Sequence, residues 1–114
     1  MSLYYDLQVF KDVYSLVQKV FLYTQDFPRE YKYTLAQDMK RDAIQLLRSI
    51  YRANKSTEKV PVLDGFLDDF ELLKLEIRLS VDMKLLSLKR QVELSVLMDS
   101  IGKQITGWRN ANRW

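Results

Sequence analysis

Basic residues recur along one stretch of the sequence at a spacing that could bind phosphate groups. Arg41, Arg48, Arg52 and Lys55 are separated by seven, four and three residues, so an α-helix would carry all four on one face. Four like charges in a row repel one another, and a helix gains nothing from them unless an anion binds. A nucleic-acid backbone is a natural counter-ion, because each phosphate contact releases condensed cations. The alternative is a solvated face that is partly paired with the acidic segment that follows.

The charge of the chain is segregated by segment. Residues 29–55 hold seven bases and three acids, residues 64–82 hold six acids and two bases, and residues 84–114 hold six bases and two acids. The overall excess is only +3, which alone is a weak indication of an anionic partner. Further bases in the last segment strengthen the expectation of an anion-binding surface: Lys89, Arg90, Lys103 and Arg109.

The composition excludes most catalytic chemistry. The chain has no cysteine and no histidine, which rules out disulfides, Cys/His zinc sites, thiol nucleophiles and Ser-His-Asp triads. The carboxylate pairs Asp68/Asp69 and Glu71/Glu76 could in principle act as acid and base or bind magnesium. We interpret them instead as solvated charge and as compensation of a helix dipole. The sequence therefore predicts no enzyme, no catalytic residue, no metal, no cofactor and no small-molecule substrate.

Length and composition predict one small helical domain over residues 1–114. Three glycines and two prolines leave few places for the chain to turn, which favours a few long helices over a sandwich or barrel. No apolar run approaches the roughly 18 residues of a membrane span. The first six residues lack the basic start and apolar block of a signal peptide, so we expect a cytoplasmic protein without a membrane partner.

Hydrophobic periodicity predicts helices at about residues 5–25, 35–54, 63–86 and 88–106. Thr34 is expected to cap the second helix in a capping box with Gln37, and residues 54–61 are expected to form a loop. Ser87 is expected to cap the fourth helix, and Gly107 to end it. Helices of this length reach about 30 Å, and short connections would pack them as an antiparallel up-down four-helix bundle.

The third predicted helix carries apolar residues on two faces. One stripe consists of Phe66, Phe70, Leu73, Ile77 and Val81, and a second consists of Leu72, Leu75, Leu79 and Leu86. One interpretation is a deeply buried helix whose wide apolar face is shared by two neighbours within the monomer. The other is that Leu72, Leu75 and Leu79 meet another subunit, because so small a domain has too little interior to cover every leucine.

Two segments carry a resemblance to a known family. They read FPREYKYTL at residues 27–35, within a similar stretch that reaches residue 56, and IGKQITGW at residues 101–108. The segment LEIRL at residues 75–79 extends the likeness over nearly the whole chain. Together they resemble the Avd family, the accessory variability determinant proteins of diversity-generating retroelements. The wider superfamily includes four-helix-bundle proteins encoded by intervening sequences in bacterial 23S ribosomal RNA genes.

The resemblance implies a non-catalytic basic bundle that assembles as a homopentameric ring. It also implies binding to a reverse transcriptase and to template-repeat RNA, or a cDNA/RNA hybrid, in support of mutagenic cDNA synthesis. Carried onto this sequence, the implied anion-binding positions are Arg41, Arg48, Arg52, Lys55, Arg78, Lys89, Arg90 and Lys103. The leucine stripe would fit the subunit interface. Because this chain is only mildly basic, an interaction module of the intervening-sequence type without a nucleic-acid role is the alternative.

Overall fold

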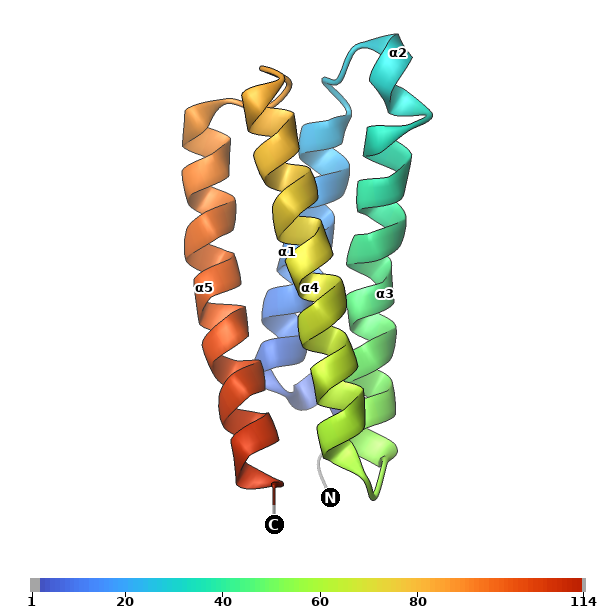
Figure 1. The fold of residues 1–114 in the computed structure, drawn as a ribbon, viewed down its shortest axis with the longest axis vertical. Coiled ribbons are helices and arrows are strands. Elements are labelled where there is room, and N and C mark those ends of the chain that lie inside the picture. Colours follow the sequence, from blue (N-terminus) through green and yellow to red (C-terminus); the bar gives the residue numbers. More distant parts are fainter. Residues whose placement is uncertain (1–2, 114) are drawn as a thin grey trace.

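The computed structural model describes residues 3–113, which form a bundle of helices (Figure 1). In chain order the elements are the 3₁₀ turn η1 (Tyr4–Asp6), α1 (Gln8–Thr24), α2 (Arg29–Lys32), α3 (Leu35–Lys55), α4 (Lys59–Asp82) and α5 (Leu88–Ala111). Within the described residues, four long helices alternate in direction, and α2 is a single turn between α1 and α3. The predicted all-α antiparallel four-helix bundle is confirmed, whereas the ring stays a prediction.

Each long helix packs against two neighbours. Helices α3 and α5 lie on opposite corners of the bundle, and both contact α1 and α4 (Figure 1). The core between them is built from the apolar stripes that the periodicity indicates. The largest fully buried side chains are Phe27, Phe66, Phe70, Leu16, Met39, Leu46, Ile50, Leu63, Leu73, Leu94, Ile101 and Ile105. Burial of this apolar surface, at about 25 cal/mol per Å², is the main force that holds the helices together.

The first predicted helix is shorter than expected. The turn η1 comes first, extended backbone at Leu7 interrupts it, and α1 starts only at Gln8. After Pro28 the chain forms the additional turn α2, which the periodicity did not indicate. This turn also explains why the predicted capping box is wrong, since the Thr34 hydroxyl donates to the Glu30 carbonyl (3.3 Å) and makes no capping bond.

The loop between α3 and α4 is also shorter than predicted. Helix α4 begins at Lys59 rather than near residue 63, with Pro61 in its first turn, where a missing backbone N–H costs little. The Lys59 ammonium group donates to three carbonyl oxygens at the end of α3: those of Ala53 (2.8 Å), Asn54 (3.1 Å) and Ser56 (2.8 Å). A side chain from the start of α4 therefore satisfies acceptors that the end of α3 leaves open.

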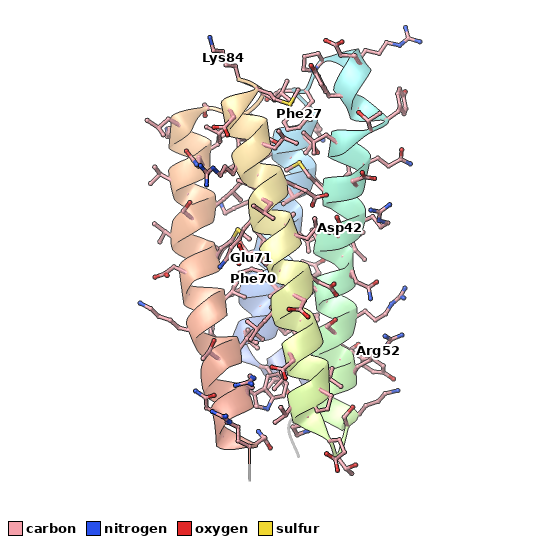
Figure 2. All side chains as sticks on the ribbon, in the orientation of Figure 1. Phe27, Asp42, Arg52, Phe70, Glu71 and Lys84 are labelled. Atoms are coloured by element: carbon pink, nitrogen blue, oxygen red, sulfur yellow. The ribbon has the colours of Figure 1, made fainter. Side chains whose placement is uncertain are left out.

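Helix α4 ends at Asp82, earlier than the predicted residue 86. Lys84 follows with a φ of 62°, and the Leu85 N–H donates to the Ser80 carbonyl (2.8 Å), so a lysine fills the left-handed position that glycine usually takes. Figure 2 shows the Lys84 side chain extending from this end of the bundle. Ser87 then caps α5 by accepting a bond from the Arg90 N–H (3.2 Å), as predicted.

The prediction that Gly107 ends the last helix is wrong. Helix α5 continues to Ala111, and Trp108 packs against the core. Arg109, in the last turn, forms an ion pair with Asp64 of α4. Because α4 starts at Lys59, its first turn holds no acidic residue, so the interpretation that Asp68/Asp69 and Glu71/Glu76 compensate the helix dipole is wrong. Residue 114 lies outside the described residues.

Candidate nucleic-acid interface

The bases predicted to share one helix face lie on α3. Arg41, Arg48, Arg52 and Lys55 are all exposed, and Arg52 points away from the bundle (Figure 2). The apolar residues of α3 pack toward α1 and α4, which holds the opposite side of the helix in solvent. We call these four residues the α3 basic face.

The four cations of the α3 basic face differ in their partners. Arg41 pairs with two carboxylates of its own helix, Asp38 (Nη1–Oδ1 3.3 Å) and Asp42 (Nε–Oδ1 3.3 Å). The Lys55 ammonium group lies 3.5 Å from the Tyr51 hydroxyl. Among residues 3–113, the side chains of Arg48 and Arg52 have no ion pair. Uncompensated positive charge therefore gathers on the C-terminal half of α3, and no ion pair in this part of the chain joins these bases to acidic α4.

The other predicted bases lie apart from the α3 basic face. Arg78 on α4 pairs with Asp82 (4.0 Å), and Lys103 on α5 pairs with Asp99 (3.3 Å). Lys89 and Arg90 lie in the first turn of α5, on the corner opposite α3 (Figure 1). The eight predicted residues thus form separate groups, and the structure brings together only the four on α3.

Arg90 is held by contacts within the bundle. Its guanidinium group pairs with Asp26 (2.8 Å) at the end of α1 and stacks 4.5 Å from the centroid of the Tyr23 ring. The Tyr23 hydroxyl in turn donates to the Glu93 carboxylate. That bond raises the pKa of Tyr23 and lowers the pKa of Glu93. Arg90 is therefore a structural contact between α5 and α1.

A groove of about 600 Å³ runs between α4 and α5. Its charged lining residues are Glu71, Lys74, Asp99 and Lys103, and they pair as Lys74–Glu71 (3.8 Å) and Lys103–Asp99 (3.3 Å). Because the two signs balance, this groove attracts a polyanion less than the α3 basic face does.

The second leucine stripe is uncovered in the monomer. Leu72, Leu75 and Leu79 keep 47%, 55% and 47% of their surface exposed, whereas Leu86 is buried. The interpretation that neighbouring helices cover the first three is therefore wrong, and their contact with another subunit stays a prediction. Helix α5 also carries exposed apolar residues that the sequence pattern did not single out: Leu88, Val92 and Val96.

The grouping of aromatic rings beside the α3 basic face was also not predicted from the sequence. A hollow of about 400 Å³ between α1 and α3 is lined by Tyr14, Phe21 and Ile44 among others. All three are exposed, as is Tyr51 one turn before Lys55. The hydrophobic period of either helix does not reveal this surface, because it forms only where the two helices meet.

A buried carboxyl group is the second feature that the sequence did not reveal. Glu76 keeps only 9% of its surface exposed, although the sequence interpretation had placed it among solvated acids. Burial, followed by the interaction with the neighbouring Asp42 carboxyl group, raises the pKa of Glu76 to about 8. The raised pKa favours the protonated carboxyl group, which is a poorer metal ligand and general base than a carboxylate.

The fold and its charges define an all-α bundle with an exposed basic helix face. The family model for bAvd-like proteins matches residues 7–112, nearly the whole chain, and the chain belongs to this family. The resemblance to Avd proteins is thereby confirmed, and the family consists of generally non-catalytic accessory proteins. A comparison with curated proteins finds no match. Across the described part of the chain, every helix is too short or too polar to cross a bilayer.

Proposed function

We propose that this protein is a non-catalytic accessory subunit of a diversity-generating retroelement that binds the reverse transcriptase and its template-repeat RNA. Membership in the bAvd-like family supports the retroelement setting. The observation that carries the RNA contact is that the exposed guanidinium groups of Arg48 and Arg52 form no ion pair among residues 3–113. Arginine presents a planar set of donors that fits phosphate oxygens. The α3 basic face is the RNA-binding surface, with Arg48 and Arg52 at its centre.

Self-assembly uses a different face in this proposal. Leu72, Leu75 and Leu79 contact another copy of the chain, and the family resemblance favours a homopentamer. Three leucines that are about half exposed lie on one side of α4, and removing such a surface from water favours association. The α3 basic face would then stay on the outside for RNA, and the remaining faces would be available to the polymerase.

Reversing the charge of the central arginines tests the RNA contact. Arg48→Glu with Arg52→Glu should weaken retention of template-repeat RNA in a gel-shift assay by roughly tenfold or more, because two phosphate contacts become repulsive. Arg29→Glu with Lys32→Glu is the matched control, since it changes net charge equally on the exposed turn α2. Circular dichroism should show equal helix content in all three proteins. Equal RNA retention by both double variants would contradict the proposed site.

A protein–protein interaction module without a nucleic-acid role is the second candidate. The exposed apolar residues on α4 and α5 favour it, because exposed apolar surface marks protein contacts. In that case the wild-type protein would bind the polymerase in a pull-down experiment while it failed to retain RNA at low salt.

A further inference from the structure

We infer that the α3 basic face binds single-stranded RNA in preference to duplex RNA, with unpaired bases stacked on aromatic rings exposed along the seam between α1 and α3. This inference rests on the proposed function and specifies the form of RNA that the face accepts. The seam consists of Tyr14 and Phe21 on α1, and Lys40, Ile44 and Tyr51 on α3.

Three rings of the seam are open to solvent, and two of them, Tyr14 and Phe21, line the groove between α1 and α3. Tyr14, Phe21 and Tyr51 keep 51%, 39% and 43% of their surface exposed. Two of them are held by aromatic neighbours: the Tyr51 ring lies 5.2 Å from that of Tyr4, and the Tyr14 ring lies 6.1 Å from that of Phe10. Rings that are fixed in place and still exposed can stack on a base without first being ordered.

Cations accompany these rings along the seam. The Lys55 ammonium group lies 4.6 Å from the centroid of Tyr51, and that of Lys40 lies 5.6 Å from the centroid of Phe21. The two lysines are about 22 Å apart along α3 at 1.5 Å per residue, with Arg48 between them. A phosphate would draw each flexible ammonium group off its ring and leave the ring face to a base. Rings and cations thus alternate along one surface, as in grooves that track a single strand.

The alternation favours a single strand over a duplex. Bases in an A-form duplex are stacked on one another, so proteins read that duplex through its shape, phosphates and 2′-hydroxyls. Exposed rings contribute little to such contacts, whereas an unpaired base gains stacking on each ring. The preference follows from Tyr14, Phe21 and Tyr51 and not from the arginines, which would contact phosphates of either form.

The seam is less suited to a protein partner. The cores of protein interfaces are depleted in charged residues, whereas Lys40 and Lys55 lie directly over rings of the seam and Arg48 has no ion pair among the described residues. The residues that line the groove include no carboxylate. An extended anion with flat apolar groups matches this surface best.

Fluorescence anisotropy with two RNA probes tests the inference. The probes are an unstructured 12-nucleotide oligo-uridine strand and a 12-base-pair RNA duplex, measured against the full chain in the same buffer. We expect Tyr51→Leu and Tyr14→Leu each to weaken binding of the single strand by roughly tenfold through lost base stacking. Binding of the duplex should change by no more than about twofold, because the phosphate contacts remain.

Two further variants serve as controls. Tyr51→Phe keeps the ring and should keep the affinity for the single strand. Tyr33→Leu removes a ring that is 75% exposed but lies before the start of α3, at the other end of this helix from Tyr51, and it should leave binding unchanged. Equal helix content by circular dichroism would show that the variants fold.

The outcomes separate this inference from the proposed function. If the wild-type chain binds both RNAs equally and the leucine variants lower neither affinity, the single-strand preference is overturned while RNA binding stands. If the wild-type chain binds neither RNA, both fail. If Tyr14→Leu changes the mass in light scattering and not the RNA affinity, the seam is a contact between copies, and the inference is overturned.

Discussion

The Glu76 carboxyl group on α4 lies close to the Asp42 carboxyl group on α3 across the interface between these helices (Figure 2 labels Asp42), and this neighbour helps to raise the pKa of Glu76. Glu76 Oε1 and Asp42 Oδ2 are both buried and have no hydrogen-bond partner among the described residues. One proton between the two groups satisfies both oxygens and avoids two adjacent buried charges. We therefore expect the protonation of Glu76 to affect the stability of the contact between α3 and α4.

Stability should fall as the pH rises because of this pair. The pKa of Glu76 is about 8 in the folded chain and 4.5 ordinarily, so the folded state binds the proton more tightly. The stabilisation is complete below pH 4.5 and is lost as the pH rises through 8. The Glu76→Gln variant stays neutral at every pH. Its free energy of unfolding, relative to that of the wild type, should therefore rise by more than about 1 kcal/mol between pH 5 and pH 9.

Urea unfolding at several pH values measures the difference in free energy of unfolding between Glu76→Gln and the wild type. Groups that titrate alike in both proteins do not contribute to this difference. Glu71→Gln removes an exposed carboxylate from the same helix. Its free energy of unfolding should show the same pH dependence as that of the wild type. A constant difference between Glu76→Gln and the wild type at all pH values would show that Glu76 is ionised in the folded protein.

Lys59 should stabilise the junction of α3 and α4. Its ammonium group donates to three carbonyl oxygens, so Lys59→Met removes three hydrogen bonds from the end of α3. We expect a loss of about 1–2 kcal/mol in the free energy of unfolding, measured by urea denaturation. Lys11→Met on the exposed side of α1 is the matched control and should change stability by less than about 0.5 kcal/mol. Equal losses in both variants would contradict the capping role.

Lys84 is a position where glycine should stabilise the fold. Its φ of 62° is costly for a residue with a Cβ atom, and glycine adopts it readily. Lys84→Gly should raise the free energy of unfolding by about 0.5–1 kcal/mol after the entropy of the unfolded glycine is counted. Lys84→Ala retains the Cβ atom and should show no such gain. Equal melting temperatures of Lys84→Gly and Lys84→Ala would argue against the left-handed turn.

The leucine stripe can be tested by its effect on mass. Leu75→Glu with Leu79→Glu should convert the proposed oligomer to a monomer in light scattering, because charge would enter an apolar interface. Val92→Glu with Val96→Glu alters apolar residues on α5 that are also about half exposed or more, and this variant should leave the mass unchanged. If the wild-type chain is itself a monomer at micromolar concentration, or if the α5 variant dissociates and the α4 variant does not, the proposed interface is wrong.

The helices were predictable because their signals are local. Apolar residues at three- and four-residue spacing indicated the buried stripes, and Ser87 was identified as a cap from its type and place. Lys84 was not predictable, because lysine carries no signal for a left-handed turn. Gly107 was misleading, since the contacts of Trp108 with the core and of Arg109 with Asp64 extend α5 beyond the glycine.

The candidate site was predictable only within one helix. The α3 basic face follows from the period of a single helix, whereas the placement of Arg78, Lys89 and Lys103 depends on how helices pack. The same limit hid the burial of Glu76 and the seam between α1 and α3. Both arise where two helices meet. The hydrophobic periodicity of one helix does not indicate which other helix packs against it.

The salt dependence of RNA binding tests the central claim, that Arg48 and Arg52 contact RNA phosphates. For single-stranded RNA the logarithm of the binding constant should fall with the logarithm of salt concentration, with a slope of about −0.7 per phosphate contacted. Arg48→Gln with Arg52→Gln removes two contacts and should make the slope shallower by about 1.4. An identical slope for the variant and the wild type would contradict the assignment of the α3 basic face.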